Sequence, residues 1–175
     1  KEYGGQGRSP IEQHLFYEIA HYEHAPLPVL PLNTVGPALM RYGSEEQKKE
    51  FLPRIVKGEA YFGLGMSEPG SGSDLASLQS RAVEDGDYYV INGQKTWASC
   101  ASFAHYFDVY VRTDFEAPKH RGISEFIVDI TSPGLSRIPM TDITGTEAWN
   151  DVFFDNVRVH KRYLVGEKNR GFYQV

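Results

Sequence analysis

The first third of the chain carries apolar side chains at helical spacing. A proline-led stretch, Ser9-Pro10-Ile11-Glu12, supplies an N-cap serine, a proline at the first helical position and a glutamate that completes a capping box. Pro26 and Pro28 interrupt the pattern. We therefore predict a helix that begins at Pro10 and ends before Pro26. Four apolar residues on one face of it recur every three or four positions: Ile11, Leu15, Ile19 and Tyr22.

Two shorter helices are predicted before Gly58. The first covers residues 34–42 and stops at Gly43, a residue that commonly follows a helix end. The second opens with another capping box, Ser44-Glu45-Glu46-Gln47, and closes at Gly58. Its buried face is expected to carry three side chains: Phe51, Leu52 and Ile55.

After Gly58 the apolar period changes from about four to two. Segments 107–112 and 126–130 alternate in the way that half-buried strands do. Asp85-Gly86 and Asn92-Gly93 are hairpin-type turn signals. The sequence predicts an α+β protein in which N-terminal helices, residues 1–58, precede an antiparallel β-barrel or sandwich, residues 59–175.

The composition is that of a globular protein, with 41% hydrophobic residues among 175 and a net charge of −5. The acidic balance and the lack of a basic run argue against a nucleic-acid partner. Cys100 is the only cysteine, so no intramolecular disulfide is expected. No run reaches the ~18 apolar residues of a membrane span, and no signal peptide is visible. The chain begins without a methionine, and we expect a fragment.

Two stretches are candidates for ligand binding. Met66 to Asp74 follows an apolar run, 61–65, and its glycines and serines expose main-chain N–H groups and hydroxyls. On composition alone a plain turn is the favoured interpretation. Further on, Trp97 offers a flat surface for stacking and Ser99 a hydroxyl for hydrogen bonding. From the residue type alone, a core tryptophan is favoured.

These stretches belong to an ordered set of blocks that resembles the acyl-CoA dehydrogenase family of flavoenzymes. The resemblance covers nearly the whole chain and implies the later part of the family's helical N-terminal domain and its middle β-domain. The family's C-terminal helical bundle is absent from these residues. The blocks are Tyr3-Gly4-Gly5, residues 43–47, Phe51-Leu52-Pro53, residues 67–74, residues 92–97, Arg121-Gly122-Ile123-Ser124, residues 152–159 and residues 165–172.

The resemblance implies that the strand and turn from Leu64 to Ser73 hold FAD. Met66 and Ser67 would lie at the pyrimidine side of the flavin. Gly72 and Ser73 would lie near the phosphates of the cofactor or the tail of the CoA thioester, which makes Ser73 a substrate-binding candidate as well.

The resemblance also implies that Trp97 packs against the isoalloxazine and that Ser99 donates to flavin N5. The family commonly has an apolar residue and then threonine after the tryptophan. Ser99 keeps the hydroxyl, whereas Ala98 reduces the bulk and leaves the local packing in question. Glu68 lies in the motif, but we expect it to brace the loop and not to act as a base.

The implied reaction is α,β-dehydrogenation of an acyl-CoA thioester, with electron-transferring flavoprotein as acceptor, in a cytoplasmic homo-oligomer of bacterial type. The family's proton-abstracting carboxylate belongs to the C-terminal bundle, so no catalytic residue is expected in this chain. An acyl-CoA oxidase, a flavin monooxygenase or a non-catalytic partner subunit remain alternatives. No metal site is expected, because the acidic and histidine side chains of the first helix are best interpreted as a solvated face: His14, Glu18, His21 and His24.

Overall fold

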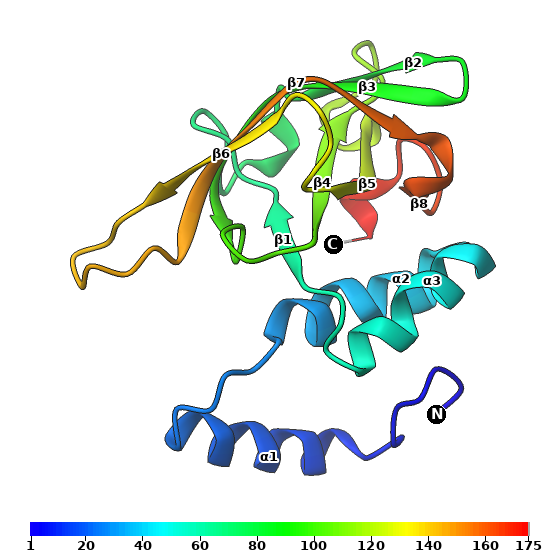
Figure 1. The fold of residues 1–175 in the computed structure, drawn as a ribbon. Coiled ribbons are helices and arrows are strands. Elements are labelled where there is room, and N and C mark those ends of the chain that lie inside the picture. The colour runs from blue at the N-terminus through cyan, green and yellow to red at the C-terminus, as the bar shows by residue number, and fades with distance from the viewer. Residues whose placement is uncertain (175) are drawn as a thin grey trace.

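The computed structural model describes residues 1–174, with the helices on one side of a β-sheet (Figure 1). The capping boxes at Ser9 and Ser44 form as predicted, each serine side chain accepting from the N–H three residues ahead. Helical structure before Gly43 starts earlier than predicted, because a π-helical turn precedes the second helix. The helical elements are α1 (Pro10–Tyr22), the π-helical turn (Pro31–Val35), α2 (Gly36–Tyr42) and α3 (Glu45–Val56).

The helices differ in how much apolar surface they bury. The predicted buried face of α3 is confirmed, since Phe51, Leu52 and Ile55 are all buried. In α1 the apolar side chains are exposed instead, up to 83% for Tyr22, and only Ala20 is buried. α2 and α3 lie between α1 and the sheet, so they provide the helical contact with the β-region (Figure 1).

Eight strands form one sheet with the order β6-β7-β3-β2-β4-β5-β8, and β1 pairs with β4. The pairs β1–β4 and β2–β4 are parallel, and the others are antiparallel. The predicted α+β class, with a mostly antiparallel β-region after the helices, is confirmed, but the strand order from β6 to β8 does not close into the predicted barrel. The strands are β1 (Phe62–Gly65), β2 (Arg81–Asp85), β3 (Tyr88–Ser99), β4 (Tyr106–Arg112), β5 (Ile123–Asp129), β6 (Leu135–Met140), β7 (Trp149–His160) and β8 (Leu164–Val165).

Only one of the two expected hairpin turns is a turn. Asp85-Gly86 does connect β2 to β3, with Gly86 at φ +61°. The prediction for Asn92-Gly93 is wrong, because both residues lie inside β3 where its register with β7 shifts. Gly93 has φ +147°, and a Cβ there would lie 2.3 Å from Ser80 Oγ. The glycine permits a close approach within the sheet and does not mark a chain reversal.

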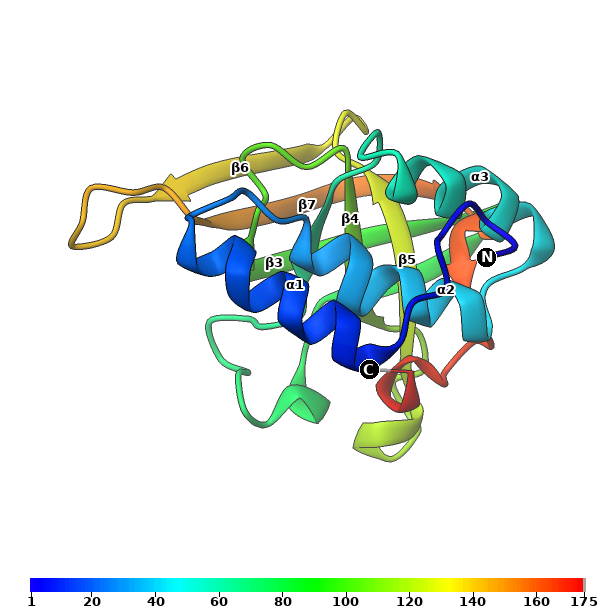
Figure 2. The same cartoon turned by 90° about the horizontal axis from the view of Figure 1, so that it is seen from below.

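The two larger apolar clusters among residues 1–174 hold the fold together. One lies within the β-region and includes Ile91, Phe107, Phe126 and Val152. The other joins α2 and α3 to the sheet. Seen from below, α1 lies in front of the strands, and the β6–β7 hairpin projects beyond the rest of the sheet (Figure 2). The helix-to-sheet cluster thus anchors β1, which leads directly into the candidate ligand-binding turn.

Candidate functional site

The segment that follows β1 lies beside the end of β3. Lys95 Nζ donates a hydrogen bond to the Met66 carbonyl oxygen (3.1 Å), and the Thr96 N–H donates to the Ser67 carbonyl oxygen (2.9 Å). Leu64, in β1 itself, is half-buried. The structure therefore brings together two stretches that are about thirty residues apart in the sequence.

Trp97 is presented to solvent by a local irregularity in β3. Its side chain is 60% exposed, so the interpretation as a core tryptophan is wrong. The register with β7 shifts between Lys95 and Ala98, and Trp97 has φ +56°, an unfavourable backbone conformation for a bulky residue. Its ring meets Trp149 edge to face, with ring centroids 6.3 Å apart. Backbone strain that presents an exposed aromatic ring is typical of a ligand-binding position.

Ser99 closes β3 next to a tightly packed residue. Ala98 is fully buried in the β-region core, so the small side chain expected to perturb packing fits its site. A Cβ on Gly63 would lie 3.2 Å from the Ser99 carbonyl oxygen, which shows how closely β1 approaches this end of β3. Burial raises the pKa of the neighbouring Cys100 thiol, which favours the protonated, unreactive form.

Glu68 and Lys95 form a buried ion pair behind the Met66 carbonyl. Lys95 Nζ lies 2.8 Å from Glu68 Oε1, and the backbone N–H groups of Gln79 and Ser80 donate to the same carboxylate at 2.6 and 2.8 Å. Burial alone raises the pKa of Glu68, but the Lys95 charge and these hydrogen bonds outweigh it and lower the pKa. Burial lowers the pKa of Lys95 to about 8, against the opposing effect of Glu68. Such a fully engaged carboxylate fits the expected bracing role.

The turn after Glu68 is closed by main-chain hydrogen bonds. The N–H and carbonyl groups of Glu68 and Ser71 bond each other at 2.8 and 3.0 Å. Gly72 and Ser73 are exposed beyond this closure, and no heavy atom lies within 4 Å of a Cβ built on Gly72. The turn is thus fixed at its base and open where phosphate or CoA contacts were expected.

Lys119 lies beside this turn and was not identified from the sequence. Its ammonium group is 3.2 Å from the Asp74 carboxylate and 2.6 Å from the Ser77 hydroxyl. Lys119 belongs to a polar, mixed-charge stretch, residues 114–121, and nothing in its local pattern indicates that this stretch folds back onto the turn.

A second set of ionisable groups, also missed, lies inside the β-region. Asp108 in β4 and Glu125 in β5 are 0% and 1% exposed. Tyr110 Oη donates to Asp108 Oδ2 (3.5 Å), and Gln174 Nε2 donates to Glu125 Oε2 (2.7 Å). Burial raises the pKa of Glu125 to about 7, while burial and the adjacent Glu125 raise that of Asp108 well above its usual range. Within residues 1–174, Asp108 Oδ1 has no hydrogen-bond partner.

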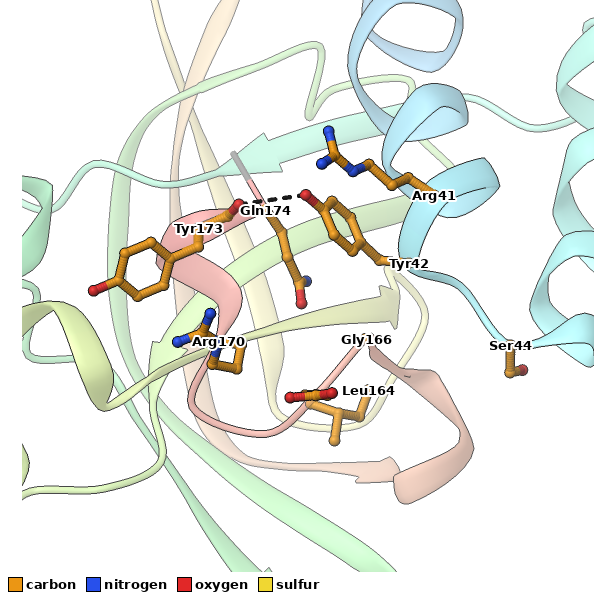
Figure 3. Close-up of a pocket in the computed structure, with 9 residues that line it drawn as sticks. Arg41, Tyr42, Ser44, Leu164, Gly166, Arg170, Tyr173 and Gln174 are labelled. Carbon is orange, nitrogen blue, oxygen red and sulfur yellow. Dashed lines mark hydrogen bonds between the residues drawn. The ribbon is translucent and has the colours of Figure 1, made fainter.

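A pocket lies elsewhere, between α2 and the end of the described chain (Figure 3). It has a volume of about 640 Å³, and Tyr42 Oη donates across it to the Tyr173 carbonyl oxygen (3.5 Å). No residue predicted to bind the cofactor lines it. Its lining consists of Arg41, Tyr42, Ser44, Leu164, Gly166, Glu167, Arg170, Tyr173 and Gln174.

Two further properties hold for the described part of the chain. No helix of residues 1–174 is both long and apolar enough to cross a membrane. Over the same residues, no three His, Cys, Asp or Glu side chains gather as a metal site requires. On α1, His14 and Glu18 are exposed and 3.8 Å apart.

Comparison with known families identifies both regions. The family model described as acyl-CoA dehydrogenase, middle domain, matches residues 63–157, and the one described as acyl-CoA dehydrogenase, N-terminal domain, matches residues 1–59. This chain belongs to the acyl-CoA dehydrogenase family. The resemblance inferred from the sequence blocks is thereby confirmed.

Relatives within the family agree along the whole chain. Acyl-CoA dehydrogenase FadE29 of Mycobacterium tuberculosis is 48% identical over 172 residues, covering 98% of this chain and 44% of the relative. The solved structure named Tcur3481-Tcur3483 steroid ACAD is 46% identical with a TM-score of 0.97, covering 99% of this chain and 45% of that one. The ChsE4-ChsE5 complex from Mycobacterium tuberculosis matches with the same identity and coverage and a TM-score of 0.94. The chain thus spans less than half the length of these relatives.

Proposed function

We propose that this acyl-CoA dehydrogenase chain forms one wall of an FAD site in an enzyme that dehydrogenates acyl-CoA thioesters. The observation that carries the proposal is Trp97, an exposed indole held at a strained bulge beside the Met66–Ser67 main chain. A planar heteroaromatic ring fits such a surface, because the indole supplies a stacking face and the adjacent serines supply hydroxyl groups.

In the proposed site each residue makes a different contact with the cofactor. When bound, FAD supplies the oxidant for removing two hydrogens from the thioester. Ser67 and Met66 would bind the pyrimidine edge, Trp97 would pack on the ring, and Ser99 would donate to N5. Leu64 would support this wall from β1, while Gly72 and the substrate-binding candidate Ser73 would face phosphates at the open turn.

Glu68 is not proposed as the base that removes the α-proton. Its carboxylate oxygens already accept from Lys95 and from two backbone N–H groups, and they are buried behind the turn. A general base needs a free oxygen within reach of the proton that it takes. We therefore propose that the base comes from a part of the enzyme outside these residues.

The acyl group proposed is a bulky one of steroid type. The support is a solved relative named as a steroid ACAD, 46% identical to this chain. A relative solved as a complex of two named proteins also makes a second family member a candidate partner, besides the homo-oligomer expected from the sequence. A cytoplasmic location and electron-transferring flavoprotein as acceptor stay predictions.

Flavin bleaching tests the proposed function. The full-length gene product, purified with FAD, is mixed anaerobically with steroid-type, straight-chain and branched acyl-CoA thioesters, and the flavin absorbance is followed. We expect bleaching with at least one thioester, fastest with the steroid type. Absence of bleaching with every thioester would contradict the proposal, and faster bleaching by straight chains would overturn the proposed substrate class.

Ser99→Ala is expected to change the redox behaviour of the flavin more than its affinity. The substitution removes one proposed hydrogen bond to N5, a contact worth about 1 kcal/mol, and leaves the stacking surface intact. Reduction potential and Kd are measured for both proteins, with Ser102→Ala as the matched control outside the proposed contacts. An unchanged absorbance spectrum and potential in Ser99→Ala would show that Ser99 does not contact N5.

A further inference from the structure

The ion pair between Glu68 and Lys95 differs from the other ion pairs of the described chain. Both its side chains are buried, since that of Lys95 is 0% exposed and that of Glu68 is 7% exposed. Every other ion pair within residues 1–174 has at least one side chain that is half exposed. Removing two charges from water is costly, and a buried pair commonly adds little net stability over apolar residues. Its position therefore calls for a role other than stability.

The pair fixes the direction of one peptide group. Lys95 Nζ holds the Met66 carbonyl oxygen at 3.1 Å, toward the protein interior. The Met66–Ser67 peptide is trans, so its N–H points opposite to its carbonyl. Because Lys95 Nζ binds the Met66 carbonyl oxygen on one side of this peptide, the Ser67 N–H is directed to the other side.

The pair also fixes the strand end that carries Trp97. Lys95 is tied to Glu68 on one side of the bulge, and Ala98 is locked in the core on the other. The Thr96 N–H is bound to the Ser67 carbonyl oxygen between them. A strained φ such as that of Trp97 persists only where the surrounding structure over-determines it, and these anchors provide that restraint.

We propose that Glu68 and Lys95 are positioning residues that align the Ser67 N–H and the Trp97 indole for the flavin, and so set its affinity and reduction potential. The inference rests on the proposed FAD site and deepens it. The pair acts through the main chain of Met66 and the bulge of β3, and neither charged group touches the cofactor itself.

The test uses the full-length gene product with FAD and three variants, Glu68→Gln, Lys95→Met and the double variant. Thermal stability, flavin Kd and reduction potential are measured at a temperature where each protein is folded. We expect the variants to bind FAD roughly tenfold or more weakly, with a shifted potential. The matched control Asp85→Asn disrupts the exposed pair with Arg158 and is expected to leave both flavin properties unchanged.

The double variant keeps the test decisive if the single variants fail to fold. It removes both charges at once and leaves no unpaired buried ion, so it is the variant most able to fold. A double variant with wild-type Kd and potential would overturn the inference, even if its melting temperature fell, because that result indicates a purely structural pair. If the wild-type protein binds FAD but is not bleached by thioesters, the proposed reaction is refuted. The flavin Kd and reduction potential of the variants would still test the positioning role of Glu68 and Lys95. Wild-type protein that binds no FAD would overturn both.

Discussion

The free energy of unfolding is expected to fall as the pH rises from about 5 to about 8, because of the buried carboxyl pair. In the folded chain the pKa of Glu125 is raised to about 7 by burial, and the pKa of Asp108 is raised well above its usual range by burial and by Glu125. The unfolded chain releases these protons near pH 4 to 4.5. Between the two ranges the folded state holds protons that the unfolded state has lost.

The size of this effect follows from linkage. Stability from the raised pKa is fully present below the unfolded value and is lost as the pH approaches the folded value. Each pH unit in that window lowers the free energy of unfolding by about 1.4 kcal/mol for one proton, giving roughly 3 kcal/mol for Glu125 alone. The pKa of Asp108 is also raised in the folded chain, so Asp108 contributes a loss in the same direction.

Asp108→Asn tests how much of this pH dependence comes from the Asp108–Glu125 pair. Asparagine keeps the shape of the side chain, removes one of the two acidic groups and can donate a hydrogen bond to Glu125. We expect a smaller difference in denaturant midpoint between pH 5 and pH 8, and higher stability than wild type at pH 8. Asp85→Asn, which replaces an exposed carboxylate on β2, is the control. A wild-type protein that is as stable at pH 8 as at pH 5 would show that the pKa values of Glu125 and Asp108 are not raised in the folded chain.

Trp97→Ala is expected to weaken flavin binding without unfolding the protein. The indole is 60% exposed, so its removal leaves no cavity in the core. Loss of ring stacking and apolar contact would cost about 2 kcal/mol of flavin binding, or roughly 30-fold in Kd. Trp97→Phe keeps a smaller ring and is expected to lose less.

Tyr88→Ala is the matched control for this substitution. Tyr88 is also an exposed aromatic residue of β3, but it lies at the opposite end of the strand from Ser99. Flavin titration and thermal melts are run on both variants in the full-length gene product. If Trp97→Ala retained the wild-type Kd, the placement of the flavin against this indole would be wrong.

Local sequence signals predicted the elements that depend on contacts between residues close together in the sequence. The capping boxes at Ser9 and Ser44 located the starts of α1 and α3, because the hydrogen bonds involved join residues three apart. The prediction at Asn92-Gly93 was wrong because an Asn-Gly pair can form a turn or allow another segment to approach closely. Here Ser80 approaches Gly93, and Ser80 is too distant in sequence for a local pattern to reveal the contact.

The sequence named candidate site residues, but it did not identify the side chains that hold them in place. The order of blocks indicated a family, and through it Ser67, Trp97 and Ser99. The alternation in β4 suggested one buried face, yet every residue from Phe107 to Arg112 is buried. Tyr110, on the second face, packs in a separate apolar cluster with Leu78 and Ile123. Asp108 and Glu125 therefore had no signal that pattern reasoning alone detects. Glu68 was expected to brace the loop, but its partner Lys95 was not identified.

The most direct test of the central proposal is a crystal structure of the full-length gene product with FAD bound. We predict that the isoalloxazine lies against the Trp97 indole, with its pyrimidine edge at Ser67 and with Ser99 Oγ within hydrogen-bond distance of N5. A flavin bound elsewhere, with Trp97 and the Met66–Ser67 main chain still facing solvent, would contradict the account.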